Sequence, residues 1–245
     1  MGVNILNERL RRWHTCSLCE QKYHGAVRCA LGWACWKTYM GRPETDQVQC
    51  MAINQLGNGF YDAAHYMDAL SVQLAEFSIL RRNGVPEERI LPVQSNLATT
   101  YLRLGRPEVL QMRRDMYSGH LKLRGEEDEH TLIAALNYAS SLGGQRRYKE
   151  LKSLLLKMVP VAQRVLGKSH DLTFRMRWIY GQALYKDASA TLDGLREAVE
   201  MLAETEQTAR RVLGGAHPTV VKVEGSPHDA RAALSARETP PPGSA

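Results

Sequence analysis

Apolar positions recur along this chain with a period of 41 to 42 residues. Each period contains a small residue and a large apolar residue three positions later, and in the first three periods a further apolar residue follows twelve positions after the small one. A fixed period of this size is typical of a helical solenoid, whose repeats bury their apolar faces against their neighbours. The small residues are Gly57, Ala98, Ala139 and Gly181, the large residues are Phe60, Tyr101, Leu142 and Leu184, and the third set is Ala69, Leu110, Leu151 and Ala198.

This pattern predicts that each repeat is a pair of antiparallel helices, named here helix A and helix B. The small residue lies in helix A and lets helix B approach closely, and the large residue one turn later fills the remaining space. Glycines and prolines between the apolar stretches mark the expected helix ends. The predicted A helices span residues 46–62, 88–104, 129–144 and 170–186, and the predicted B helices span 66–82, 107–124, 148–166 and 194–213.

The fourth repeat contains five extra residues, which we place within 186–193. Because of this insertion, Ala198 follows Gly181 by 17 residues instead of twelve, and it matches Ala69, Leu110 and Leu151 only when the five extra residues are allowed for. The same five residues explain the glycine spacing at the repeat junctions, which is 42 between Gly125 and Gly167 but 47 between Gly167 and Gly214. Because one insertion accounts for both irregularities, the register of the four repeats is self-consistent.

The predicted fold is therefore all-α, a right-handed α-solenoid of about four helix pairs preceded by a small cysteine-rich segment. Residues 1–44 form the basic, cysteine-rich head, and residues 45–223 form the repeats. A short degenerate capping helix is expected in 224–237 and a disordered tail in 238–245, where prolines cluster. The individual repeats are predicted at about 45–85, 86–126, 127–168 and 169–216.

Short motifs recur at the repeat junctions and in helix A: Val165-Leu166-Gly167 with His170 and Thr173, Val212-Leu213-Gly214 with His217-Pro218, and the triplets Asn96-Leu97-Ala98 and Asn137-Tyr138-Ala139. These motifs resemble tetratricopeptide repeats, and more closely the 42-residue repeats of kinesin light chains. The resemblance covers about residues 46–220 and implies binding of a protein partner. The long heptad coiled coil by which kinesin light chains join the motor is not found in the sequence, so a motor role is not implied.

The net charge of +6 is concentrated in the head, where seven lysines and arginines face two glutamates within residues 1–42. A basic segment can contact nucleic acid, although solvated side chains on a short helix are the simpler interpretation. We do not expect nucleic acid to be the main partner. The sequence contains no apolar stretch long enough for a transmembrane helix and no signal-peptide core, so a cytoplasmic protein without membrane contact is expected.

All five cysteines lie within the first 50 residues. This clustering indicates a local structural site rather than a secreted fold held together by disulfides. The spacing of Cys16 and Cys19 is that of a zinc knuckle, and Cys29 and Cys35 complete four soft ligands for a structural zinc, with His14 or His24 as substitutes. A strand at 23–28 and a helix at 30–40 would hold them. The head faintly resembles half of a MYND-type zinc finger.

The alternative is that Cys29 and Cys35 are small buried residues that pack on the first repeat, since they share helical spacing with Trp33 and Trp36. Cys50, within the first A helix, is expected in the core. His170 and His217 are expected to cap the turns between repeats rather than to bind a metal.

Helix A lines the concave face in this architecture, and partners contact the positions two before and one after the small residue. Most of these positions carry amides or hydroxyls, and an amide can bond both the N–H and the C=O of an extended peptide. The resemblance implies the same use of Asn96 and Asn137. Arg103, Arg175 and Lys186 would favour an acidic partner. The other predicted groove residues are Gln55, Asn58, Thr99, Ser140, Ile179 and Gln182.

These patterns favour a non-enzymatic protein-interaction scaffold that binds a peptide or partner protein in the repeat groove. No phosphate loop, paired-carboxylate motif or catalytic triad spacing is present, so no catalytic residues are predicted and no cofactor beyond the zinc. The alternative hypothesis assigns the function to the head, which would bind nucleic acid or a nuclear partner while the repeats serve as an assembly platform.

Overall fold

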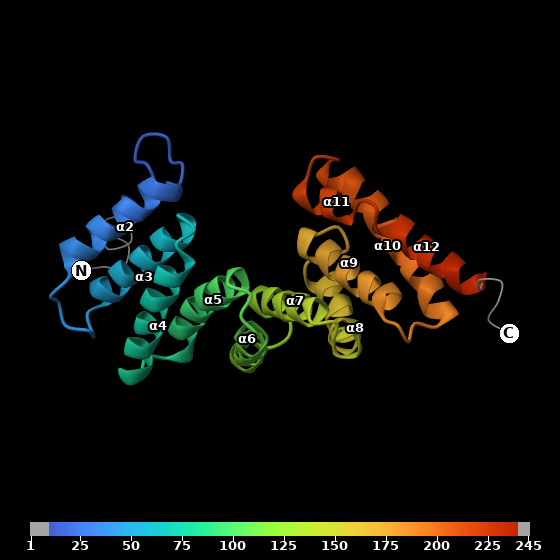
Figure 1. Cartoon of the computed structure of the whole chain (residues 1–245), viewed down its shortest axis with the longest axis horizontal. Helices are drawn as coiled ribbons and strands as arrows, with labels where there is room; N and C mark the ends of the chain where they lie inside the picture. Colours follow the sequence, from blue (N-terminus) through green and yellow to red (C-terminus); the bar gives the residue numbers. More distant parts are fainter. Residues whose placement is uncertain (1–9, 240–245) are drawn as a thin grey trace. The chain divides into compact units, whose positions relative to one another are not determined.

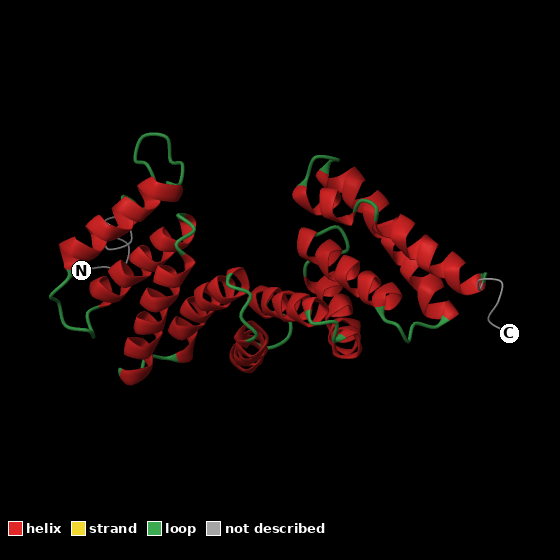
Figure 2. Cartoon of the chain, viewed as in Figure 1, coloured by secondary structure: helices red, strands yellow, loops and turns green. Residues whose placement is uncertain are grey.

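The computed structural model describes residues 10–239, and these residues form α-helices joined by short loops (Figures 1 and 2). Within this range no β-strand forms, and the sole extended pairing is an isolated antiparallel bridge between Thr15 and Lys22. The chain divides into two compact units, residues 1–112 and 113–245, which are described separately. Of the tail predicted at 238–245, residues 240–245 lie outside the described part of the chain.

The helices confirm the predicted all-α solenoid class. Each A helix and each B helix begins and ends within two residues of the predicted position. The A helices are α3 (Gln47–Asp62), α5 (Glu87–Arg103), α7 (Glu129–Gly144) and α9 (Asp171–Lys186), and the B helices are α4 (Tyr66–Arg82), α6 (Glu108–Arg124), α8 (Tyr148–Val165) and α10 (Leu192–Leu213).

Side-chain caps fix the start of the helix after each of the last three junction glycines. The ring Nδ1 of His170 accepts a hydrogen bond from the backbone N–H of Leu172 at 3.2 Å, and His217 bonds Thr219 in the same way at 3.2 Å. Asp128 caps α7 from the equivalent position. The prediction that the two junction histidines are turn caps is confirmed, because each satisfies a backbone donor that the first helical turn leaves unpaired.

The small residues of the A helices lie where helix B crosses. A Cβ placed on Gly57 would lie 3.1 Å from Cγ of Gln73 in α4, and one on Gly181 would lie 2.8 Å from Cγ of Leu202 in α10. Gln73 follows its glycine by 16 residues and Leu202 by 21. The difference of five residues equals the predicted insertion, which lengthens both the loop between α9 and α10 and helix α10 itself, which has 22 residues against 17 or 18 in the other B helices.

The head does not contain the strand predicted at 23–28. Helix α2 (Gly25–Tyr39) begins there instead, five residues earlier than the predicted helix. Its buried residues, Arg28, Gly32 and Cys35, recur at helical spacing and face α3. With no second strand beside it, this segment satisfies its backbone donors within the helix.

Glycines let α2 and α3 come into backbone contact. A Cβ on Gly32 would lie 2.8 Å from the carbonyl oxygen of Gln55, and a Cβ on Gly59 would lie 2.9 Å from the carbonyl oxygen of Arg28. Cys35, further along α2, is fully buried in a cluster with Ala52 of α3. The pairing runs antiparallel, so α2 packs on the first A helix as closely as a B helix would.

The end of the described chain covers the last repeat. Helices α11 (Pro218–Val223) and α12 (Ser226–Glu238) replace a fifth repeat, and α12 packs on α10 and α9. Phe174 of α9 is fully buried against Ala209 and Val220, and the indole N–H of Trp178 donates to Ser226 Oγ at 2.9 Å. Helix α12 therefore covers the apolar face of α10 close to the position where the sequence predicts a short helix.

Candidate partner-binding groove

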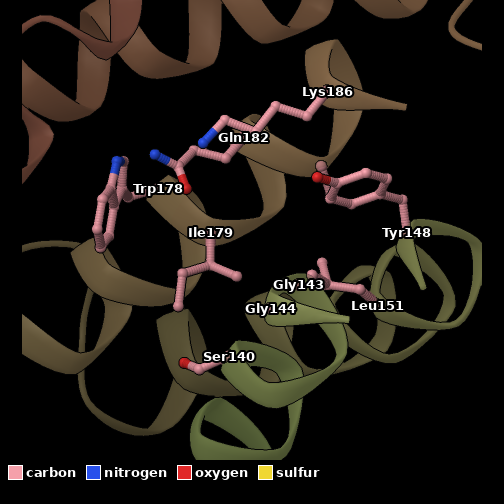
Figure 3. A pocket seen from close by; sticks show the side chains of 10 residues that line it. Ser140, Gly143, Gly144, Tyr148, Leu151, Trp178, Ile179, Gln182 and Lys186 are labelled. Carbon is pink, nitrogen blue, oxygen red and sulfur yellow. The ribbon is translucent and has the colours of Figure 1, made fainter. Parts of the chain in front are cut away.

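A cavity of about 330 Å³ lies in the C-terminal unit, where the two neighbouring A helices α7 and α9 meet helix α8 (Figure 3). Its polar lining includes Ser140 from α7 and Gln182 and Lys186 from α9, three of the residues predicted for the groove. Ile179, the fourth predicted residue here, lies between them on α9. The sequence pattern thus selected residues that the structure does bring together in one concavity.

The rest of the lining is apolar or aromatic and was missed from sequence. Leu151 and Tyr148 come from α8, and Trp178 comes from the position just before Ile179. Gly143 and Gly144 leave the α7 side open, although the sequence indicated them only as a helix break. A mixed lining of this kind can hold an apolar side chain while amides and hydroxyls bond the backbone that carries it.

The predicted basic residues differ in their surroundings. Arg175 has its guanidinium 3.9 Å from the carboxylate of Asp171, one turn earlier on α9. Lys186 is exposed on the rim of the cavity, with its ammonium 5.6 Å from the ring centre of Tyr185. In the N-terminal unit, Arg103 is exposed and donates through Nε to the hydroxyl of Tyr61 at 3.1 Å.

The amides at the other groove positions lie outside this cavity. The side chains of Asn96 and Asn137 are partly buried, and the backbone carbonyl of Asn137 accepts a hydrogen bond from the Arg113 guanidinium at 3.0 Å. The hydroxyl of Thr99 donates to the backbone carbonyl of Ser95 in its own helix at 2.8 Å. The last two predicted residues, Gln55 and Asn58, line a different cavity in the N-terminal unit, between α3 and the head.

The head presents Cys16 and Cys19 together on a hairpin of residues 14–23. Cys16 donates its backbone N–H to the carbonyl of Gln21 at 2.9 Å, and its carbonyl accepts from Glu20 at 3.0 Å. The backbone N–H groups of Cys19 and Leu18 lower the pKa of the Cys16 thiol to about 7. A hydrogen bond from the Cys19 side chain also lowers the pKa of Cys16, so the two thiols lie close together.

The other two predicted ligands lie elsewhere on α2. Cys35 is fully buried beside Leu10 and Ala52, and burial raises the pKa of its thiol to about 11. Burial also raises the pKa of Cys29. Among residues 10–239, no three histidine, cysteine or acidic side chains come together in a way that could hold a metal ion. The four-cysteine set thus does not fit a tetrahedral zinc in this arrangement, and Cys50 lies in the core as expected.

Zinc binding by the head stays a prediction from sequence, and metal analysis tests it. The hypothesis predicts roughly one zinc ion per chain in purified protein and none after Cys16→Ser. Since Cys35 would have to leave its apolar cluster to become a ligand, zinc should also change its reactivity toward an alkylating reagent. Equal metal content in the wild type and the variant would argue against the knuckle as a metal site.

The stacked helical hairpins give this chain the fold of tetratricopeptide-type helical repeats. Two crystal structures of TPR-like repeats assigned to a kinesin light chain from Podosopora anserina share 17% identity with it. One, of a point variant, has a TM-score of 0.64 over 78% of this chain and 88% of its own, and the other has 0.63 over 81% and 91%. No protein-family model and no curated protein matches the sequence.

A third similar structure is BtubC (BKLC) from P. vanneervenii, with 14% identity, a TM-score of 0.57, and coverage of 89% of this chain and 95% of that one. At this level of identity the likeness shows the fold alone. No helix within residues 10–239 has both the length and the apolar character needed to cross a membrane. The MYND-like character of the head stays a prediction.

Proposed function

We propose that this chain is a non-enzymatic interaction scaffold that holds an extended segment of a partner protein in the groove between α7 and α9. The observation that carries the proposal is the cavity of about 330 Å³ at this place, lined by Ser140, Gln182 and Lys186 around an apolar floor. The fold it shares with tetratricopeptide-type repeats supports the same conclusion, because adjacent repeats of a solenoid offer extended binding surfaces.

The chemistry of the lining defines the segment that would fit. The Gln182 amide carries both donors and an acceptor, so it can bond a peptide backbone of any sequence. Leu151, Trp178 and Ile179 favour one apolar side chain in the cavity. Lys186 on the rim favours an acidic residue close to it. The predicted amides Asn96 and Asn137 would contact further parts of the partner.

Filling the cavity is expected to remove binding without harming the fold. A Cβ on Gly144 would meet no atom within 4 Å, and Gly144 is the last residue of α7, so leucine there should be neutral or stabilise the unit by up to about 1 kcal/mol. Its side chain would occupy the mouth of the cavity. We expect Gly144→Leu to weaken at least tenfold, on the order of 1.4 kcal/mol, the binding of peptides that a synthetic array selects with the wild type.

Gly215→Leu is the matched control, because a Cβ there also meets no atom within 4 Å and the residue lines neither cavity. It should bind the selected peptides as the wild type does. Retained binding by Gly144→Leu would refute the groove between α7 and α9 as the peptide site. Asn96→Ala and Asn137→Ala, measured on the same array, show whether the contact extends beyond this groove.

A further inference from the structure

A second cavity, of about 430 Å³, lies in the N-terminal unit where the hairpin of residues 14–23 and helix α2 meet α3. Its charged lining consists of Lys22 and Arg28, which are cationic, and a single acid, Asp62. Side chains of His14 and His24 add ring nitrogens, and Asn58 adds an amide. The cavity therefore combines an excess of positive charge with hydrogen-bond donors from several elements.

Arg28 forms the inner wall of this cavity and is held in place. Its side chain is 7% exposed, and its two terminal nitrogens donate to the backbone carbonyl of Trp13, at 2.7 Å, and to Oε1 of Gln55. The carboxylate of Asp62 is 3.9 Å from Nε and 38% exposed, which is a long contact for a buried charge. Burial lowers the pKa of Arg28. A second anion in the cavity would stabilise this guanidinium.

The beginning of α2 adds to the positive potential. His24 caps this 15-residue helix without a side-chain hydrogen bond, and the first turn contains no acidic residue. The first backbone N–H groups of a helix carry a partial positive charge that favours anions. His24 itself lines the cavity, so this helix end lies beside Lys22 and Arg28.

We propose that this cavity binds a phosphate group, either as the free ion or as a phosphate monoester. A carboxylate is matched best by the two parallel donors of an arginine fork, but the terminal nitrogens of Arg28 already donate to Trp13 and Gln55. Lysine is a point charge that suits phosphate, and the tetrahedral dianion accepts bonds from several directions. The site lies outside the groove between α7 and α9 and goes beyond the proposed scaffold function.

Calorimetric titration of the full chain with sodium phosphate, at constant ionic strength, tests the proposal. We expect saturable binding in the millimolar range or tighter, weakened about fivefold to tenfold by Lys22→Ala. Gln55→Glu should abolish it, because the new carboxylate keeps the acceptor for Arg28 while neutralising its charge. Lys37→Ala, an exposed lysine on the same helix outside the cavity, should bind phosphate as the wild type does.

Two further ligands are tested: phosphoserine distinguishes a phosphate monoester from the free phosphate ion, and acetate distinguishes phosphate from a carboxylate. Phosphoserine that binds more tightly than inorganic phosphate would assign the site to a monoester, and equal binding would assign it to the phosphate ion itself. Acetate should not compete with either. The proposal is overturned if no phosphate ligand binds saturably, if Lys22→Ala and Gln55→Glu bind as the wild type does, or if acetate competes on equal terms. Gly144→Leu should leave phosphate binding unchanged, so this result is independent of the peptide groove.

Discussion

Replacing Glu76 with glutamine is expected to stabilise the N-terminal unit by roughly 2–4 kcal/mol at pH 8 and to change its stability little near pH 5. Glu76 lies on α4 with 3% of its surface exposed, and Nδ2 of Asn54 donates to its carboxylate at 3.2 Å. Burial raises the pKa of this carboxyl from 4.5 to about 8, and the bond from Asn54 offsets only part of the effect. The charged form is thus costly in the folded state.

The direction of this pH dependence of stability follows from the number of protons that the folded and unfolded chains bind. Between about pH 4.5 and pH 8 the folded protein keeps a proton on Glu76 that the unfolded chain has lost. Stability therefore falls as the pH rises through this range. Glutamine does not titrate, and its amide oxygen can still accept the hydrogen bond from Asn54, so the variant should lack this loss.

Urea unfolding at several pH values between 5 and 8 measures the effect. In a Trp178→Phe background the three remaining tryptophans, Trp13, Trp33 and Trp36, all belong to the N-terminal unit and report on it alone. Glu88→Gln, at an exposed position of α5, is the control and should change stability by less than about 0.5 kcal/mol at any of these pH values. A Glu76→Gln variant with the pH dependence of the wild type would contradict the buried, protonated carboxyl.

Adding a methyl group to Gly59 is expected to destabilise the same unit by about 1–3 kcal/mol, even though alanine is the better helix former by up to about 1 kcal/mol. The new Cβ would lie 2.9 Å from the backbone carbonyl of Arg28, and a Cβ on Gly32 would lie 2.8 Å from the carbonyl of Gln55. Backbone atoms cannot move aside as the end of a side chain can. Either substitution must therefore push α2 away from α3.

Unfolding curves from circular dichroism, together with alkylation of Cys35 mapped by mass spectrometry, test this expectation. Cys35 is fully buried between the two helices, so it should react faster in Gly32→Ala and Gly59→Ala than in the wild type. Gly144→Ala is the control, since its Cβ would meet no atom within 4 Å. Unchanged stability and unchanged Cys35 reactivity would show that α2 is not packed on α3 through these glycines.

The repeats were predictable because their information is local and periodic. The small residue of each A helix, such as Gly57 or Gly181, fixes where helix B must cross, and the five-residue insertion shifts the facing residue by five positions. Junction histidines such as His170 cap their own helices, so the sequence is sufficient to place them. Part of the groove followed from the same register, which selected Ser140, Gln182 and Lys186.

The sequence by itself thus determined the fold class, the helix ends and part of the lining of the cavity between α7 and α9, because helix periodicity and caps act over a few residues. Only the tertiary structure decided which residues of different helices contact one another. It packs α2 against α3 through Gly32 and Gly59, which separates Cys35 from the knuckle, and it buries Glu76. It also brings Lys22 and Arg28 to the lining of one cavity. These contacts join residues from different elements, and their surroundings depend on packing that no local pattern encodes.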